Sequence, residues 1–200
     1  MNTLFSEAIK LKDGVLYNLD YHQMRVNRTL QQFFGTSIDL SVLAQLIPED
    51  KKSGLYKCRV LYNARIVSVE CTPYQFRSIQ SVGVVNANHI SYDYKYADRS
   101  DLNRLLEKSG CDDMILIKDR LVTDASFANL VFQSPNGLYT PTSYLLRGTK
   151  REYLLDKGLI QEREIRQEDL TQYERVFFIN ALIDLEDNIS MDIQSLRYLT

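Results

Sequence analysis

Alternating apolar and polar positions begin the chain and predict a β-hairpin. Residues 4–12 have the pattern of a strand, Asp13-Gly14 is a turn and residues 15–19 form the returning strand. A second hairpin is expected over residues 55–73, around Asn63-Ala64-Arg65. Both hairpins lie within the first 73 residues, so we expect antiparallel β-structure there.

Between the hairpins the apolar residues recur at the spacing of an α-helix, over residues 20–34. We expect Asp20 to cap this helix and Gly35 to end it. A shorter helix fits residues 40–47, and Pro48 should stop it. The apolar face of the longer helix is formed by Tyr21, Met24, Leu30, Phe33 and Phe34.

The rest of the chain mixes strands and helices, which predicts an α+β fold. Further strands are expected at residues 82–86, 114–118, 128–133, 160–165 and 176–180. Ser134-Pro135-Asn136-Gly137 is a turn, and a helix fits residues 149–157 before Gly158. We take residues 74–79 as the crossing between a small N-terminal α/β domain, residues 1–76, and a larger C-terminal domain, residues 77–200.

Composition excludes several classes of protein. The formal net charge is −2, so the composition does not indicate a basic surface that would bind nucleic acid. No apolar run approaches the roughly 20 residues of a membrane span, and the N-terminus lacks the apolar core of a secretory signal. Cys58, Cys71 and Cys111 form neither a metal pattern nor an evident disulfide framework, and only His22 and His89 could add imidazole ligands. We therefore expect a cytoplasmic protein without a metal site.

Two residues suggest chemistry on an aldehyde cofactor. Lys95 lies between Tyr94 and Tyr96, and burial of a lysine favours the neutral amine that attacks an aldehyde. About thirty residues downstream, Asp124 in Val-Thr-Asp could keep a pyridine nitrogen protonated. Taken singly, each has an ordinary alternative: a solvated loop lysine and a turn aspartate. Together they are the two protein groups that pyridoxal phosphate (PLP) chemistry needs most.

Candidate phosphate ligands lie on both sides of this pair. Arg25, in His22-x-x-Arg25, could present its guanidinium to an anion. Gly148, Thr149 and Lys150 open a predicted helix, where backbone N–H groups favour anions, and Asn180-Ala181 follows a strand. The alternatives are a surface arginine, a plain helix entry and a turn.

In this order the residues resemble the class IV, or fold type IV, PLP-dependent enzymes. That family includes branched-chain aminotransferases, D-amino-acid aminotransferases and aminodeoxychorismate lyases. The resemblance covers nearly the whole chain, because separate motifs match in sequence. These motifs are the strand and turn at residues 5–14, His22-x-x-Arg25, Lys95 with Arg99, Val122-Thr123-Asp124 with Asn129-Leu130, Tyr139-Thr140-Pro141 with Gly148-Thr149-Lys150-Arg151, and residues 176–181.

The resemblance implies a two-domain fold like that of D-amino-acid aminotransferase, with PLP in the cleft between the domains. Lys95 would then form the Schiff base with the cofactor and act as the general base, and Asp124 would face the pyridine nitrogen. The phosphate ligands would be Arg25, Gly148, Thr149, Lys150, Asn180 and Ala181. It also implies a homodimer and a small-molecule amine substrate.

The chain departs from the family pattern at three places. Asp124 stands where the family usually has glutamate, which is one methylene longer. Thr149 and Lys150 stand at the isoleucine and threonine positions of Gly-Ile-Thr-Arg. Met1 lies only four residues before Phe5, so we expect a short member without the usual N-terminal strand that helps to wall the substrate pocket.

Three functions follow from the resemblance. The first is an aminodeoxychorismate lyase, which converts 4-amino-4-deoxychorismate to 4-aminobenzoate and pyruvate in folate biosynthesis. The second is a class IV aminotransferase acting on branched-chain or D-amino acids. The third is a PLP-binding protein with little turnover, which the retention of Lys95 argues against. The short chain and Asn180-Ala181-Leu182 favour the lyase.

Overall fold

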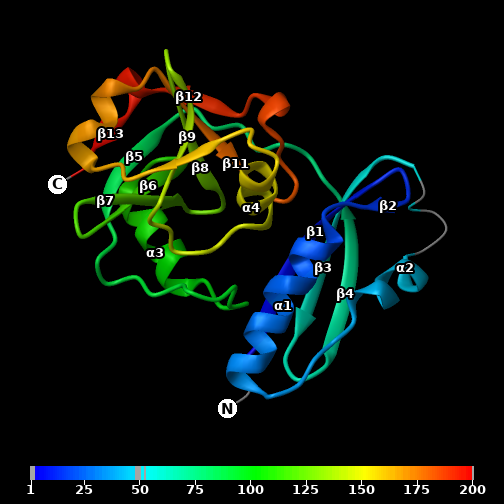
Figure 1. Ribbon diagram of the computed structural model, residues 1–200. Helices are drawn as coiled ribbons and strands as arrows, with labels where there is room; N and C mark the ends of the chain where they lie inside the picture. Colours follow the sequence, from blue (N-terminus) through cyan, green and yellow to red (C-terminus); the bar gives the residue numbers. More distant parts are fainter. Residues whose placement is uncertain (1–2, 48–50, 52, 200) are drawn as a thin grey trace. The chain divides into compact units, whose positions relative to one another are not determined.

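The computed structural model describes residues 3–47, 51 and 53–199 of the chain. They form two compact units (Figure 1). Unit 1 consists of Met1–Phe76 with Tyr94–Asp98, and unit 2 of Arg77–Asp93 with Arg99–Thr200. No helix among the described residues is both long and apolar enough to cross a membrane.

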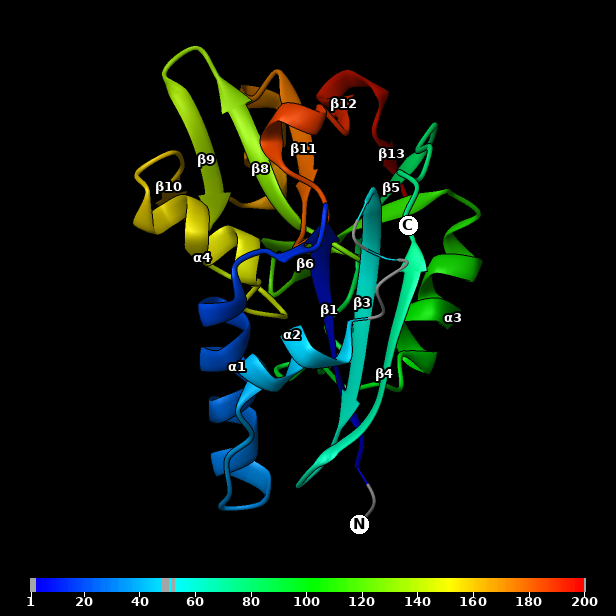
Figure 2. The same cartoon turned by 90° about the vertical axis from the view of Figure 1, so that its right-hand side faces the viewer.

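Unit 1 is a four-stranded antiparallel sheet with a helix packed on it. The strand order is β2-β1-β3-β4, and Figure 2 shows β1, β3 and β4 side by side. The strands are β1 (Phe5–Lys12), β2 (Val15–Leu16), β3 (Leu55–Tyr62) and β4 (Ile66–Pro73). The helices are α1 (Leu19–Phe33), the short 3₁₀ helix η1 (Leu40–Val42) and α2 (Leu43–Leu46). The predicted stop at Pro48 lies outside the described residues.

The hairpin of β1 and β2 forms where the Asp-Gly turn predicts it. Asp13 and Gly14 both have positive φ, 49° and 79°, as a tight hairpin turn requires. The returning strand is shorter than expected, because Asn18 turns left-handed at φ 54° and α1 begins at Leu19. Asp20 is therefore not the cap but a first-turn residue, where its charge favours the helix dipole.

The buried face of α1 differs from the predicted apolar face. Met24 and Phe33 are exposed, at 57% and 39%, although Leu30 is buried as expected. The buried side chains of α1 are His22, Arg25, Val26, Thr29 and Leu30. The helix is thus rotated so that three charged or polar residues, His22, Arg25 and Thr29, face inward, which requires buried partners for them.

The segment that carries Lys95 belongs to unit 1, whereas the sequence analysis placed Lys95 in the C-terminal domain. Strand β2 pairs only with the last two residues of β1, so the start of β1 has an open edge. The N–H of Ser6 donates to the carbonyl of Lys95 at 2.9 Å, and that of Ala97 to the carbonyl of Leu4 at 2.9 Å. These bonds tie residues 94–98 to β1.

Unit 2 is built on nine strands of the described residues. The order is β10-β9-β8-β7-β6-β5-β13; β11 pairs with β8 and β12 with β11. The strands are β5 (Val82–Asn86), β6 (Asp113–Lys118), β7 (Leu121–Ala125), β8 (Asn129–Ser134), β9 (Gly137–Pro141), β10 (Gln161–Arg163), β11 (Arg175–Ile179), β12 (Ser190–Asp192) and β13 (Arg197–Tyr198). The helices are α3 (Ser100–Ser109), α4 (Thr149–Asp156) and the 3₁₀ helices η3 (Gln167–Gln172), η4 (Leu185–Asp187) and η5 (Ile193–Ser195).

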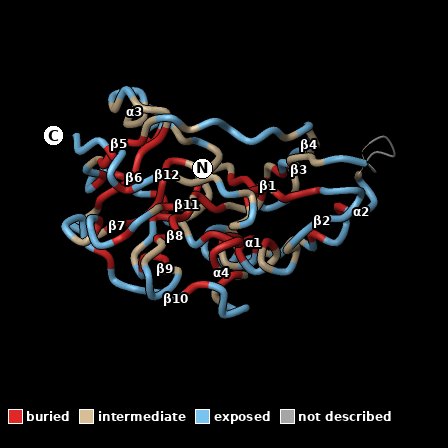
Figure 3. The backbone as a smooth tube through the Cα atoms, turned by 90° about the horizontal axis from the view of Figure 1, so that it is seen from above, coloured by how far each residue is buried: buried red, intermediate tan, exposed pale blue. Residues whose placement is uncertain are grey.

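Each unit has its own hydrophobic core. In Figure 3 the buried stretches lie on β1 in unit 1 and on the central strands of unit 2, while β4 has no buried residue. The core of unit 1 joins Phe5, Ile9 and Leu11 of β1 to Val26 and Leu30 of α1. Because β1 is covered on one face by α1, any polar side chain on that face is held out of water.

Candidate active site

Glu7 of β1 is the polar side chain buried beneath α1. Period-two alternation puts it on the same face as Phe5 and Ile9, and it is 0% exposed. Arg25 Nε donates to Glu7 Oε1 at 2.9 Å and Arg25 Nη2 to Glu7 Oε2 at 2.5 Å. His22 Nδ1 lies 2.5 Å from the same Oε2. The three residues form one buried ionic cluster, which we call the Glu7 cluster.

The charges of the Glu7 cluster follow from its surroundings. Burial alone raises the pKa of Glu7, but the charge of Arg25 and the hydrogen bond from His22 outweigh it and hold the pKa at about 2. Burial lowers the pKa of His22, and the charges of Arg25 and Lys95 lower it further, against the opposing pull of Glu7. Glu7 is thus anionic and His22 neutral at pH 7. The charge of Lys95 contributes to the lowered pKa of His22.

Lys95 is partly buried, in a segment whose aromatic residues pack against the core of unit 1. The rings of Tyr94 and Tyr96 lie 6.3 Å apart. The Tyr96 ring lies 5.2 Å from that of Phe5, so residues 94–98 are anchored in the core of unit 1. The guanidinium of Arg28, one helical turn after Arg25, lies 5.7 Å from the centre of the Tyr94 ring. Lys95 and Arg25 therefore belong to one unit, together with a second arginine.

In unit 2, Asp124 is buried and held at both carboxylate oxygens. Asn129 Nδ2 donates to Oδ1 at 2.7 Å, as expected for residues paired across β7 and β8. The N–H groups of Leu145 and Leu146 donate to Oδ2 at 3.0 and 2.8 Å. An ionised carboxylate accepts about four hydrogen bonds, so this arrangement leaves room for one further donor.

The environment of Asp124 makes it an unusually weak acid. Burial raises the pKa of Asp124 to about 6, against the lowering effect of its three hydrogen bonds and of Arg151. A cation placed against the carboxylate would favour its ionised form. Asp124 is therefore suited to a partner that gains from a nearby negative charge, such as a protonated ring nitrogen.

Gly148 precedes α4 and lies tightly against Asn129. A Cβ on Gly148 would come within 1.7 Å of Asn129 Oδ1, so no other residue fits without moving that side chain. Asn129 Nδ2 also donates to the Leu146 carbonyl at 3.0 Å. Asp124, Asn129 and the loop that leads into α4 are thus one interlocked structure, and it fixes the N-terminus of α4.

The predicted phosphate-binding residues of unit 2 also form hydrogen bonds and ion pairs within the protein. Lys150 is 5% exposed and its ammonium pairs with Asp184. Asn180 uses its side-chain oxygen to accept from the N–H groups of Leu182 and Ile183, at 2.8 and 3.1 Å. What Lys150 can offer an anion is consequently its backbone N–H in the first turn of α4, where N–H groups lack intrahelical partners.

The structure thus gathers the candidate residues into two groups. Unit 1 holds Arg25 and Lys95; unit 2 holds Asp124, the start of α4 and Asn180-Ala181. The sequence analysis did not find Glu7 or Asp184. A signal for Glu7 existed, because a charged residue at an apolar position of an alternating strand implies a buried partner. Asp184 gave no local signal, since it lies 34 residues from Lys150.

These residues fit a cofactor with an aldehyde, a ring nitrogen and a phosphate. Lys95 supplies an amine, Asp124 a buried acceptor with capacity for one more donor, and the first turn of α4 a set of backbone donors. Arg25 supplies a buried cation whose guanidinium is oriented by hydrogen bonds from Nε and Nη2 to Glu7. The donor set therefore matches the group that the sequence suggested.

Comparison with known proteins identifies the family. Residues 4–185 match the family model of amino-transferase class IV. The chain belongs to the class IV aminotransferase family. The family inferred from the sequence is confirmed, and with it the prediction of a PLP-dependent enzyme.

Individual relatives agree with this assignment. An uncharacterised protein of Haemophilus influenzae is 38% identical over an alignment of 181 residues, and the match covers 88% of this chain and 96% of the relative. A Haemophilus somnus protein, provisionally named a 4-amino-4-deoxychorismate lyase, superposes with a TM-score of 0.84 at 35% identity, over 91% of this chain and 97% of its own. A PLP-bound hypothetical aminotransferase of Mycobacterium tuberculosis shares the fold, with a TM-score of 0.76 at 16% identity over 96% of this chain and 81% of its own. The predicted fold type IV architecture is therefore confirmed.

Proposed function

We propose that this PLP-dependent enzyme is a 4-amino-4-deoxychorismate lyase, which forms 4-aminobenzoate and pyruvate. The observation that carries the proposal is the likeness to the Haemophilus somnus protein of that provisional name, at 35% identity and over 91% of this chain. The site supports it, since the residues that the reaction requires are present and none of their placements contradicts it.

Each candidate residue has a separate task in the proposal. Lys95 would hold the cofactor aldehyde, Arg25 and the first turn of α4 the phosphate, with Asn180-Ala181 in support, and Asp124 the ring nitrogen. The bound cofactor supplies an electron sink for the substrate carbon that carries the amine. The proposal requires residues of both units to act on one cofactor.

Lys95 is also the proton carrier in this mechanism. Once a substrate amine has replaced it, Lys95 Nζ takes the proton from the carbon that bears the amine. The bond between the substrate ring and the enolpyruvyl oxygen then breaks, and the substrate ring becomes the aromatic ring of 4-aminobenzoate. The departing enolpyruvate receives a proton and leaves as pyruvate, so the atoms of the substrate are divided between two products with no acceptor needed.

The negative charge of Asp124 would keep the ring nitrogen of the bound cofactor protonated. Its hydrogen bonds from Asn129, Leu145 and Leu146 fix the carboxylate so that it does not need to reorganise during the reaction. Asp124 is one methylene shorter than the family's usual glutamate. The N–H groups of Leu145 and Leu146, in the loop that ends at Gly148, hold its carboxylate in position.

The test supplies aminodeoxychorismate to the PLP-loaded protein and follows pyruvate and 4-aminobenzoate together. We expect equal amounts of both, without a keto acid, and none from Lys95→Ala. Amine transfer from a branched-chain or D-amino acid to a keto acid, without pyruvate release, would replace the lyase by the aminotransferase. Neither activity in a protein that holds PLP would favour a binding protein. The homodimer and the cytoplasmic location remain predictions.

A further inference from the structure

Two of the three cysteines, which the sequence left unconnected, lie opposite each other in unit 1. Cys58 on β3 and Cys71 on β4 are direct partners in the register of the antiparallel pair. The register of β3 and β4 shifts only between Leu61 and Tyr62, beyond this position. Both cysteines are present as free thiols.

The hydrogen-bond pattern shows which kind of pair they form. The N–H of Tyr74 donates to the carbonyl of Leu55, its opposite residue, at 3.0 Å, so that pair is hydrogen-bonded. Hydrogen-bonded and non-hydrogen-bonded pairs alternate along an antiparallel ladder, and Cys58–Cys71 lies three pairs further on. It is therefore a non-hydrogen-bonded pair. Pro73, which has no N–H, occupies another such position opposite Tyr56.

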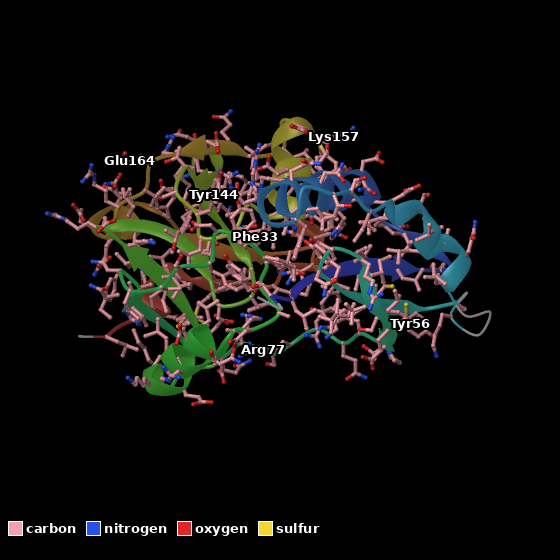
Figure 4. All side chains as sticks on the ribbon, turned by 90° about the horizontal axis from the view of Figure 1, so that it is seen from below. Phe33, Tyr56, Arg77, Tyr144, Lys157 and Glu164 are labelled. Atoms are coloured by element: carbon pink, nitrogen blue, oxygen red, sulfur yellow. The ribbon has the colours of Figure 1, made fainter. Side chains whose placement is uncertain are left out.

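Non-hydrogen-bonded pairs bring side chains closest together. Their Cα atoms are about 4.5 Å apart, and disulfides span Cα distances of about 4.4 to 6.8 Å. Both cysteines point to the α1 side of the sheet, as does Tyr56, which Figure 4 labels on β3 two residues before Cys58. Burial, together with a hydrogen bond to the Cys71 side chain, raises the pKa of the Cys58 thiol.

We propose that Cys58 and Cys71 are a thiol–disulfide site, which a hydroperoxide oxidises to a cross-strand disulfide and a dithiol reductant restores. In the first step the sulfur of Cys71 takes the terminal oxygen of the peroxide and becomes a sulfenic acid, while one water leaves when hydrogen peroxide is the oxidant. In the second step the sulfur of Cys58 attacks that of Cys71, the S–O bond breaks and a second water leaves. Two thiols and one peroxide thus give one disulfide and two waters.

The order of the steps follows from exposure. Cys71 is partly exposed, whereas Cys58 is 0% exposed in the core beneath α1. An oxidant therefore meets Cys71 first, and Cys58 acts as the resolving thiol. The site does not depend on the reaction that the enzyme catalyses, since neither cysteine is among the candidate active-site residues.

The experiment treats the full-length protein with a modest excess of hydrogen peroxide, then counts free thiols and maps peptides without reduction. We expect three thiols to fall to one, the intact mass to drop by two hydrogens, and one linked peptide pair containing Cys58 and Cys71. Dithiothreitol should restore all three thiols. Cys71→Ser should keep both of its remaining thiols reduced under the same dose, and Cys111→Ser, the matched control in unit 2, should still form the link.

Other outcomes would overturn the proposal. Three thiols that persist would show that the pair does not oxidise, and a link that includes Cys111 would show that oxidation follows unfolding. A stable sulfinic acid on Cys71 would show that Cys58 does not resolve the first product. Circular dichroism of each variant before treatment distinguishes a folded, unreactive pair from a misfolded one.

Discussion

Glu7 and Arg25 meet at two points inside unit 1, with Nε to Oε1 at 2.9 Å and Nη2 to Oε2 at 2.5 Å. Neither side chain is appreciably exposed, at 0% and 7%. The pair fixes the orientation of the Arg25 guanidinium, so the residue proposed to bind phosphate is oriented by one that the sequence analysis did not identify.

Removing the charge of Glu7 should destabilise the fold. Glu7→Gln keeps the shape but leaves the buried Arg25 without its counter-ion, a loss that typically costs about 3–5 kcal/mol. The free energy of unfolding in urea measures it. The matched control is Asp101→Asn, which breaks the exposed pair with Arg104 and should change stability by less than about 1 kcal/mol. Equal effects of the two substitutions would contradict the account of the Glu7 cluster.

Arg25 should contribute to binding of the cofactor's phosphate rather than of its pyridine ring. We expect Arg25→Ala to weaken PLP binding by about 10- to 100-fold, because hydrogen bonds to charged groups contribute about 1.5–3 kcal/mol. Pyridoxal, which lacks the phosphate, should bind the variant and the parent alike. Equilibrium dialysis with both ligands gives the ratio of affinities. A variant that weakens both ligands equally would show that Arg25 only maintains the fold.

Asp124 should make stability depend on pH in a definite direction. Its pKa is raised to about 6 from 3.8, so between these values the folded protein binds the proton more tightly than the unfolded chain. Its contribution is therefore favourable at low pH and is lost as the pH rises through about 6. The two-unit difference corresponds to roughly 3 kcal/mol.

The comparison with Asp124→Asn isolates this effect, because His22 titrates in both proteins. His22 has a lowered pKa, and its contribution is lost as the pH falls below its ordinary value near 6.5. The unfolding free energy of the parent minus that of the variant should thus fall between pH 4 and pH 7, in urea titrations without PLP. A difference that is constant or rises would show that Asp124 is not a buried weak acid.

Gly148 and Asn129 should behave as a coupled pair. Gly148→Ala places a Cβ within 1.7 Å of Asn129 Oδ1 and should destabilise by about 1–3 kcal/mol, as overpacking does. In an Asn129→Ala background the clashing atom is absent, so the added cost of Gly148→Ala should be much smaller. A double-mutant cycle of unfolding free energies measures the coupling. Strict additivity would mean that the loop before α4 moves without strain.

Local patterns predicted much of the fold. The Asp13-Gly14 turn, the α1 and α4 helices and strands β5, β6, β8 and β11 form where turn residues and periodicity place them, whereas β7 and β9 were not predicted. Helix α3 was missed although its signals were present: Leu102, Leu105 and Leu106 share a face, and Gly110 ends the helix at φ 62°.

Other features depend on contacts that are distant in sequence. The attachment of residues 94–98 to β1 and the pairing of Lys150 with Asp184 have no local pattern. The rotation of α1 was mispredicted because its inward residues, His22 and Arg25, are polar and are stabilised there by Glu7. The candidate active-site residues were identified from motifs, whereas the partners that orient them became visible only in three dimensions.

The central claim is that Lys95 carries PLP. Borohydride reduction of the PLP-loaded protein, followed by digestion and mass spectrometry, fixes the cofactor on the amine that holds it. We predict one pyridoxyl adduct, on Lys95, and none in Lys95→Ala. The control Lys150→Met removes a buried lysine of unit 2 and should leave the adduct on Lys95 in place. An adduct on any other lysine, or no adduct after full loading, would contradict the account.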